Sequence, residues 1–228
     1  MSDDQQSLLQ FTGAARLFPL PNLVLFPQVV VPLHIFEPRY RELTADALET
    51  DRLISVVLLR PGWESDYEGK PAIHPVGCLG RIIAEQKRPD GRYDILLRGL
   101  SRVRFGVETA TDHLYRVAQA QLLQDGPLPT VETAVALRHE LAERVLPRFV
   151  NSPAQAQLRE LFDGDLPLGP LCDVLSFALP VPTVEKQVLL EMLDVARRAQ
   201  HLIQQVDEMA PFAVSASDRK FPPDFSSN

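Results

Sequence analysis

The sequence predicts an α+β protein, in which a β-rich half with one embedded helix is followed by a helical half. Three observations support this prediction. Between residues 16 and 125 the apolar residues come in short runs separated by Pro, Gly and charged turns, as in β-strands. Beyond residue 130 they recur at spacings of three and four, as on one face of a helix. Between the halves, the stretch Asp125-Gly126-Pro127-Leu128-Pro129 predicts a linker.

Prolines interrupt the first predicted strands. The runs Leu17–Leu20, Leu23–Phe26 and Val29–Leu33 each contain or adjoin a proline. Because proline cannot donate to a sheet ladder, these strands should be short, bent or at an edge. Pro38 then suits the first turn of a helix. An amphipathic helix is expected over residues 38–49, where the apolar residues recur at helical spacing: Tyr40, Leu43, Ala47 and Leu48.

Further strands follow this helix. They are expected at Leu53–Leu59, Val76–Gln86, Tyr93–Leu97, Arg102–Phe105 and Leu114–Leu123. Residues 60–75 form a loop rich in Pro, Gly and charge, which carries Trp63 and Tyr67. Gly77 and Gly80 permit a bulge or a close backbone approach within their strand. In total, about six or seven strands with one embedded helix favour a small twisted barrel or a pair of sheets.

The second half is expected to consist of helices. Thr130 is positioned to cap a helix over Val131–Leu146 that ends or kinks at Pro147. Shorter helices are expected over Ala154–Phe162 and Pro170–Leu179. Thr183 should cap the longest helix, which runs to about Met209 and packs through one apolar seam: Val188, Met192, Val195, Ala199, Leu202 and Val206.

These elements divide the chain into four segments. Residues 1–15 are expected to be a flexible lead-in, 16–125 the strand-rich part, 126–210 a helical bundle and 211–228 a disordered tail rich in Pro and Ser. Cys78 and Cys172 lie in apolar surroundings, which favours buried free thiols over a disulfide.

Length and composition narrow the classes of function. The chain has 228 residues, 45% of them apolar and 23% charged, with a formal net charge of -7 and 20 prolines. This length does not accommodate a multi-domain ATP-driven machine, and an acidic chain is a poor general binder of nucleic acid. The polar start and the absence of an apolar run of about 20 residues predict a cytoplasmic protein without a membrane segment.

The sequence contains no recognisable catalytic or cofactor motif. It has no phosphate-binding P-loop, no zinc-protease helix and no nucleophile elbow around a serine. The five histidines are scattered along the chain, and each is expected to be an ordinary surface or capped residue. We therefore predict no catalytic residue, no metal and no cofactor. These absences favour a binding module over an enzyme.

Basic residues are concentrated in one segment. Residues 81–116 hold eight Lys or Arg and five Asp or Glu, so this segment is +3 while the rest of the chain is -10. Arg102 and Arg104 are expected to project from one strand face, which is either a solvated sheet face or, together with Arg98, a surface for a polyanion. Between Arg81 and Arg104, Tyr93 is the only aromatic residue that could stack on bases, which weakens the nucleic-acid interpretation.

Several stretches, in order, resemble the N-terminal domain of Lon proteases, in the form of small stand-alone bacterial Lon-domain proteins. The resemblance rests first on residues 17–27, LFPLPNLVLFP, and 31–40, VPLHIFEPRY. Weaker matches follow at residues 76–82, 90–99, 102–105 and 184–191. Together they span roughly residues 16–208. The resemblance implies a β pseudo-barrel like that of the PUA superfamily, followed by a helical bundle.

The resemblance also implies a non-catalytic substrate-recognition module for peptides or unfolded protein. The full protease continues into an ATPase and a Ser–Lys peptidase, which this chain does not match, so a peptidase label would be inherited from the family name. A full-length Lon-type protease is a further candidate partner, with this chain as an adaptor or regulator of proteolysis. The expected peptide contacts are apolar residues near loops: Phe26, Pro27, Phe36, Trp63 and Tyr67.

Several alternatives remain open at this stage. Plain core packing explains Phe26 and Phe36 better than peptide contact does, whereas Trp63 in its polar loop fits either role. Glu37, Arg39 and Tyr40 are expected to fix the start of the helix against the barrel rather than to touch a ligand. The alternative functions are a PUA-like nucleic-acid binder that uses the Arg-rich strands, and a hydrolase without a recognisable motif.

Overall fold

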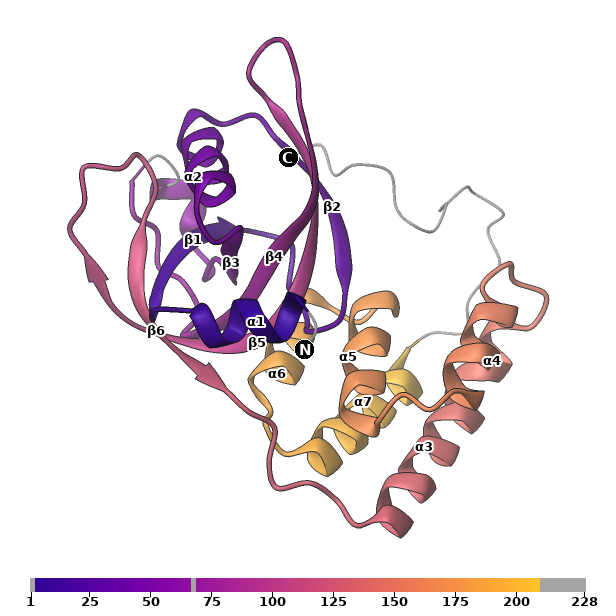
Figure 1. The fold of residues 1–228 in the computed structure, drawn as a ribbon. Helices are drawn as coiled ribbons and strands as arrows, with labels where there is room; N and C mark the ends of the chain where they lie inside the picture. Colours follow the sequence, from indigo (N-terminus) through magenta and orange to yellow (C-terminus); the bar gives the residue numbers. More distant parts are fainter. Residues whose placement is uncertain (1–2, 67–68, 210–228) are drawn as a thin grey trace. The chain divides into compact units, whose positions relative to one another are not determined.

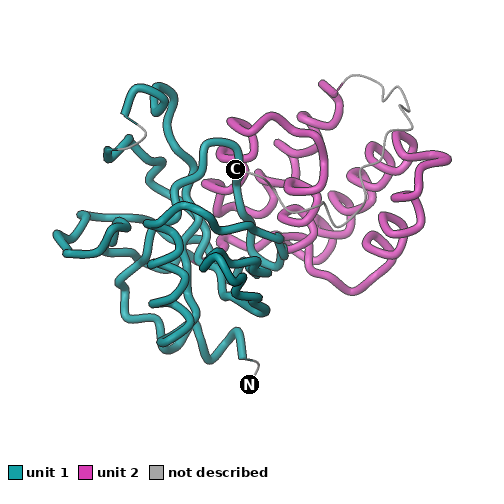
Figure 2. Tube along the Cα trace, turned by 90° about the horizontal axis from the view of Figure 1, so that it is seen from above, with its two compact units in different colours: residues 1–123, 219–228 teal, residues 124–218 magenta. Residues whose placement is uncertain are grey.

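The structure of the chain, a computed structural model, describes residues 3–66 and 69–209 (Figure 1). The described residues fold into two compact units that divide between Leu123 and Gln124 (Figure 2). Tyr67 and the tail expected over 211–228 lie outside the described residues.

The first unit is a ring of β-strands with a helix embedded in it. Its sheet order is β2-β5-β4-β3-β1-β6, and β6 pairs again with β5, so that five strands close on themselves while β2 pairs with β5 beside the ring. This confirms the predicted pseudo-barrel with one embedded helix. The elements are α1 (Asp3–Gln10), β1 (Ala14–Leu20), β2 (Val30–Ile35), α2 (Pro38–Glu49), β3 (Leu53–Leu58), the 3₁₀ helix η1 (Trp63–Asp66), β4 (Val76–Lys87), β5 (Tyr93–Thr109) and β6 (Val117–Leu123).

Glycines and register shifts allow the ring to close. The β4–β5 pairing shifts register between Leu79 and Gly80, at one of the two glycines expected to permit a bulge. At Gly77 an added Cβ atom would lie 2.4 Å from the Val56 carbonyl oxygen, a close approach that only glycine permits. Gly99 of β5 is more crowded still, since a Cβ there would lie 2.1 Å from the Phe26 carbonyl oxygen.

The prolines inside strands occupy positions where a missing N–H is tolerated. Pro32 lies in β2, which ends the strand order and pairs only with β5. Pro19 lies in the half of β1 beyond Arg16, where the register to β6 has ended and β1 pairs with β3 alone. Both positions behave as sheet edges, which is where proline is expected in a sheet.

The structure differs from the sequence prediction at three places in this unit. Residues 23–26 are not a strand, although Val24, Leu25 and Phe26 are buried, because the chain turns at Gln28 with φ of 68°. The two strands expected over 93–105 are one continuous strand, β5. Part of the expected lead-in is helix α1, whose acidic first turn pairs with Arg81 and Arg98.

The second unit consists of helices. They are α3 (Val131–Val145), the 3₁₀ helix η2 (Leu146–Phe149), α4 (Gln155–Asp163), α5 (Leu168–Ala178), α6 (Thr183–Glu191) and α7 (Val195–Glu208). Its core includes fully buried leucines on three of these helices: Leu141, Leu171, Leu175 and Leu202. Thr130 caps α3 as expected, because its side-chain oxygen accepts a hydrogen bond from the Thr133 backbone N–H at 3.3 Å.

The prediction of one long final helix is wrong. The helix breaks between Glu191 and Val195, and its N-cap is Pro182 rather than Thr183. The break is held by polar contacts that apolar periodicity cannot show. Asp194 caps α7 by accepting from the Arg197 backbone N–H at 3.0 Å, and Arg198 donates to the Met192 carbonyl oxygen at 2.7 Å.

Both cysteines are free and buried, as predicted. Across residues 3–66 and 69–209, no helix combines the length and apolar character that a membrane crossing requires.

Candidate functional site

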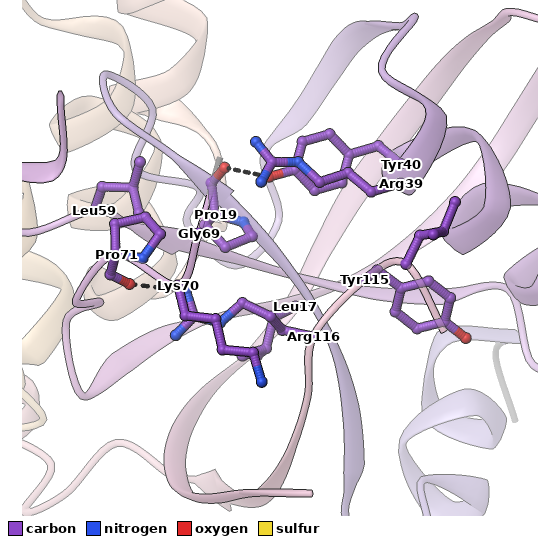
Figure 3. A pocket seen from close by; sticks show the side chains of 11 residues that line it. Leu17, Pro19, Arg39, Tyr40, Leu59, Gly69, Lys70, Pro71, Tyr115 and Arg116 are labelled. Atoms are coloured by element: carbon purple, nitrogen blue, oxygen red, sulfur yellow. Dashed lines mark hydrogen bonds between the residues drawn. The ribbon is translucent and has the colours of Figure 1, made fainter. Parts of the chain in front are cut away.

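A pocket opens in the first unit beside the half of β1 that pairs only with β3. It encloses about 280 Å³ and brings together β1, the start of α2, the end of β3, residues 69–71 and residues 114–116 (Figure 3). Its lining residues are Leu17, Pro19, Arg39, Tyr40, Leu59, Gly69, Lys70, Pro71, Leu114, Tyr115 and Arg116. The β1–β6 register ends at Arg16, and beyond it the Leu17 backbone N–H donates to the Arg116 carbonyl oxygen at 2.8 Å. Leu17 and Pro19 are themselves buried, so they form the covered side of the lining.

Tyr40 fixes one wall of the pocket. Its hydroxyl donates to the Pro19 carbonyl oxygen at 3.3 Å, which ties the first turn of α2 to β1 (Figure 3). Its ring packs edge-on against Phe18 with centroids 4.4 Å apart. These contacts give Tyr40 the predicted role of holding the helix start against the barrel, and they also place it at the pocket.

Arg116 fixes the opposite wall and is fully engaged. Its Nε donates to Glu108 at 3.0 Å and its Nη1 to the Pro71 carbonyl oxygen at 2.8 Å. The hydrogen bond from Arg116 lowers the pKa of Glu108, and the Lys70 charge adds to that effect. The Glu108 carboxylate therefore stays ionised and neutralises Arg116, so the Arg116–Glu108 pair carries no net charge.

The remaining cations of the pocket differ in their partners. The Arg39 guanidinium pairs with Glu37 at 2.8 Å. Lys70 is exposed, and within the described residues no carboxylate lies within ion-pair distance of its ammonium group. The Asp66 carboxylate accepts instead from the Lys70 backbone N–H at 3.2 Å. The pocket thus combines apolar walls with one uncommitted positive charge.

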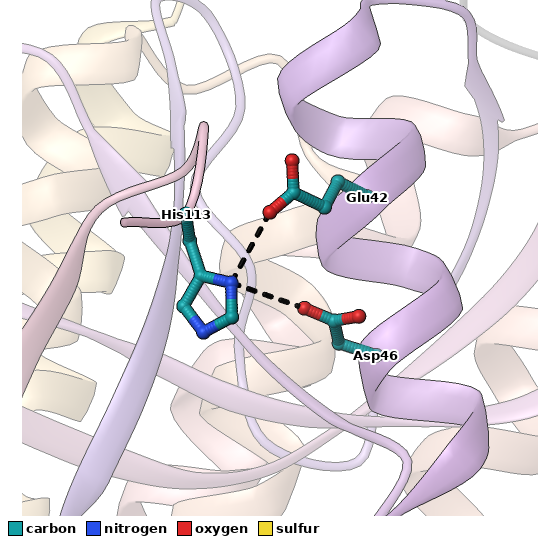
Figure 4. Close-up of side chains that lie close together, drawn as sticks. All are labelled: Glu42, Asp46 and His113. Atoms are coloured by element: carbon teal, nitrogen blue, oxygen red, sulfur yellow. Dashed lines mark hydrogen bonds and ion pairs between the residues drawn. The ribbon is translucent and has the colours of Figure 1, made fainter. Parts of the chain in front are cut away.

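A polar cluster borders the pocket on its Tyr115 side. The Tyr115 hydroxyl donates to Asp46 at 2.8 Å, and burial, reinforced by Asp46, raises the pKa of Tyr115 to about 12. His113 Nδ1 lies 3.1 Å from Glu42 and 3.5 Å from Asp46 (Figure 4). Glu42, Asp46 and His113 could offer a metal three ligand atoms within 4.8 Å of one another. Hydrogen bonds from Tyr115 and from the Leu114 backbone account for how the two carboxylates are held.

The residues predicted to contact peptide occupy other positions. Phe26 is 0% exposed and belongs to the core. Pro27 and Trp63 are half-buried, and Trp63 lies in η1. Phe36 is half-buried beside a hollow of about 20 Å³ that shares Tyr40 with the larger pocket. Of the four predicted residues that the structure describes, none lines the 280 Å³ pocket, and Tyr67 falls outside the described residues.

The three arginines considered for a polyanion surface do not share one exposed face. Arg98 pairs with Asp4 of α1 at 3.2 Å. Arg102 is only 3% exposed, whereas Arg104 is exposed. The sequence places Arg102 and Arg104 on one side of the strand, but it does not show that one of them is covered.

Sequence reasoning missed the pocket because its lining comes from five separated segments. None of these segments carries a motif of its own, and the lining depends on where β6 stops covering β1. One signal was available. Arg39 and Tyr40 close the second stretch that carries the family resemblance, and both line the pocket.

The ring of strands followed by helices is the architecture of solved Lon N-terminal domains. A Lon N-terminal domain protein from Xanthomonas campestris is similar with a TM-score of 0.60 and 26% identity, over 84% of this chain and 97% of that one. The N-terminal domain of Mycobacterium avium complex Lon protease shares the fold, with a TM-score of 0.65, 18% identity, and coverage of 86% of this chain and 100% of that one. The chain belongs to the family described as the ATP-dependent protease La (LON) substrate-binding domain, which matches residues 14–208.

Curated relatives are much longer than the matching region. Lon protease 2 of Syntrophobacter fumaroxidans is 30% identical over 207 residues, which are 89% of this chain and 26% of that protein. Lon protease 2 of Myxococcus xanthus is also 30% identical, over 80% of this chain and 22% of that protein. The chain thus spans about a quarter of the length of the curated relatives it matches.

Proposed function

We propose that this chain binds peptides or unfolded protein segments, and that the pocket beside β1 receives an apolar side chain of the bound segment. The observation that carries the proposal is the pocket itself, with Leu17, Pro19, Leu59 and Leu114 in its lining, in a chain of the Lon substrate-binding domain family. Unfolded segments expose apolar side chains that folded proteins bury, so an apolar pocket selects for them.

The size of the pocket suits this role. Its volume of about 280 Å³ is at the small end of the ligand sites of proteins, which are about 300–1,000 Å³. It therefore suits one or two side chains of a polypeptide better than a large cofactor. Its walls are held by the Tyr40–Pro19 and Arg116–Pro71 hydrogen bonds, so binding requires little reorganisation.

The proposed role is recognition without chemistry at this pocket. Neither a histidine nor a cysteine is among the described residues that line it. The raised pKa of Tyr115 keeps its hydroxyl protonated at neutral pH, and Arg116 is occupied by Glu108 and Pro71. The lining therefore offers contacts and charge, and no activated nucleophile.

Replacing Leu114 with serine tests the proposal. The Leu114 side chain is 63% exposed and lines the pocket, so Leu114→Ser removes apolar contact without opening the core. We expect this variant to bind a fluorescently labelled, permanently unfolded protein about threefold to tenfold more weakly, measured by anisotropy.

The matched control is Val107→Ser. Val107 is 75% exposed in the same unit and is not part of the pocket lining. The Val107→Ser variant should bind the unfolded protein as tightly as the parent chain does. Absence of binding by the parent at tens of micromolar, or equal binding by both serine variants, contradicts the proposal.

A second candidate role follows from the relatives. The chain matches a quarter of Lon proteases and nearly all of a solved Lon N-terminal domain protein. We propose that it can act beside a full-length Lon-type protease as an adaptor that supplies bound segments. Co-purification of the tagged chain with that protease, and its loss in the absence of substrate protein, test this role.

A further inference from the structure

The three cations of the pocket lining differ in whether a carboxylate neutralises them. Arg39 and Arg116 each have a carboxylate partner, Glu37 and Glu108. Lys70 brings a third cation to the lining, and among the described residues its ammonium has no ion-pair partner. Lys70 and Leu114 are both exposed members of the same lining.

The Lys70 charge acts on the same part of the pocket as the Arg116–Glu108 pair. Its ammonium is close enough to Glu108 to help lower the pKa of that carboxyl, although Arg116 is the larger cause. Glu108 is held by Arg116, which is itself fixed to the Pro71 carbonyl oxygen. Lys70 therefore adds positive potential to a pocket whose other charges cancel.

We infer that the pocket selects a polypeptide segment in which an apolar side chain is adjacent to a carboxylate, with the apolar group against Leu59 and Leu114 and the carboxylate on Lys70. This inference rests on the proposed function, and it adds the chemical class of the ligand. A carboxylate forms a charge-assisted hydrogen bond with a lysine ammonium. A basic residue at the same place on the ligand meets Lys70 with like charge and is disfavoured.

A carboxylate beside an apolar side chain has two sources in a polypeptide. One is the C-terminal carboxylate of a chain that ends in an apolar residue, and the other is an Asp or Glu next to an apolar residue. The chemistry that Lys70 recognises is the same in both. Three labelled peptides separate them: one ending in Leu with a free carboxylate, the same peptide as a C-terminal amide, and the amide with Glu before the Leu.

Anisotropy titrations of the full chain with these peptides test the inference. On the parent chain, we expect the free-carboxylate or the Glu-containing peptide to bind about tenfold more tightly than the plain amide. Lys70→Gln should remove this difference between the peptides. Lys87→Gln removes the same charge from an exposed position outside the lining and should preserve the difference.

The outcomes separate the inference from the function on which it rests. If all three peptides bind equally to the parent chain, or if Lys70→Gln weakens all of them alike, the carboxylate preference is wrong while peptide binding stands. If none of the peptides binds the parent chain and the unfolded protein does not bind either, the proposed function itself fails.

Discussion

The surroundings of Lys186 in α6 change its acid–base behaviour. Burial lowers the pKa of its ammonium from 10.5 to about 8. Its Nζ nevertheless donates to the Phe177 carbonyl oxygen at 2.6 Å and lies 5.5 Å from the centre of the Phe177 ring. The folded state thus holds this amine where its charged form is poorly solvated.

This burial predicts a pH-dependent stability. Between about pH 8 and pH 10.5 the unfolded chain keeps a proton on Lys186 that the folded chain has released, so the free energy of unfolding rises with pH. We expect the parent chain to gain on the order of 2 kcal/mol over this interval relative to Lys186→Met, which has no ammonium to titrate. Urea unfolding of both proteins from pH 7 to pH 10 measures the difference. Parallel curves for the two proteins contradict the prediction.

At the scale of elements, a buried ion network joins three segments of the helical unit. Arg198 of α7 is 0% exposed and forms hydrogen bonds with Asp125, before α3, at 2.9 and 2.5 Å. Its Nε also lies 3.4 Å from Asp173 of α5, which is 2% exposed. The same guanidinium donates to Met192 and so stabilises the break between α6 and α7.

Removing the cation of this network is expected to be costly. Arg198→Met leaves Asp173 buried without its cation, so we expect a loss of about 3–5 kcal/mol in the free energy of unfolding, measured in urea. The double variant Arg198→Met/Asp173→Asn removes the buried negative charge as well, and it should recover part of that loss. A double variant no more stable than Arg198→Met contradicts this account.

The accuracy of the sequence prediction varied between elements for physical reasons. The helix over 38–49 was predicted to the residue, because Pro38 marks its start and its apolar face is regular. The break after Glu191 could not be predicted, because the apolar spacing in the sequence continues through it. In the structure the seam is buried only after the break, at Val195, Ala199, Leu202 and Val206. The contacts that produce the break come from Arg198 and Asp194. The sequence alone does not show which groups such polar side chains will contact.

At the scale of the whole molecule, the fold was more predictable than the site. The ordered stretches of sequence that resemble the Lon N-terminal domain predicted the barrel, the embedded helix and the helical unit. The pocket depends instead on tertiary closure, since it lies beyond the end of the β1–β6 pairing, where Pro71 and Tyr115 approach from distant parts of the sequence. A single aromatic residue in a polar stretch, such as Trp63, is easily noticed in a sequence, whereas a lining assembled from single residues is not.

The charge of the whole chain bears on the nucleic-acid alternative. The net charge is -7. Asp4 pairs with Arg98, and Arg102 is 3% exposed, which leaves Arg104 as the exposed member of the three candidate arginines. One exposed arginine out of these three neutralises too few phosphates for stable binding by the proposed surface. The basic segment thus acts as part of the barrel and its ion pairs.

We therefore expect no binding of labelled single-stranded RNA at about 150 mM salt, and only weak, salt-sensitive binding at about 20 mM, measured by electrophoretic shift. Arg104→Glu should leave the result at 150 mM unchanged. Asp4→Asn is the more stringent test, because it removes the partner of Arg98 and so leaves β5 with a second unneutralised arginine. Binding by the parent chain below about 1 µM at 150 mM salt, with its loss in Arg104→Glu, would establish the nucleic-acid function instead. We expect neither the parent chain nor Asp4→Asn to bind RNA at about 150 mM salt, which would rule out this alternative to the proposed peptide binding.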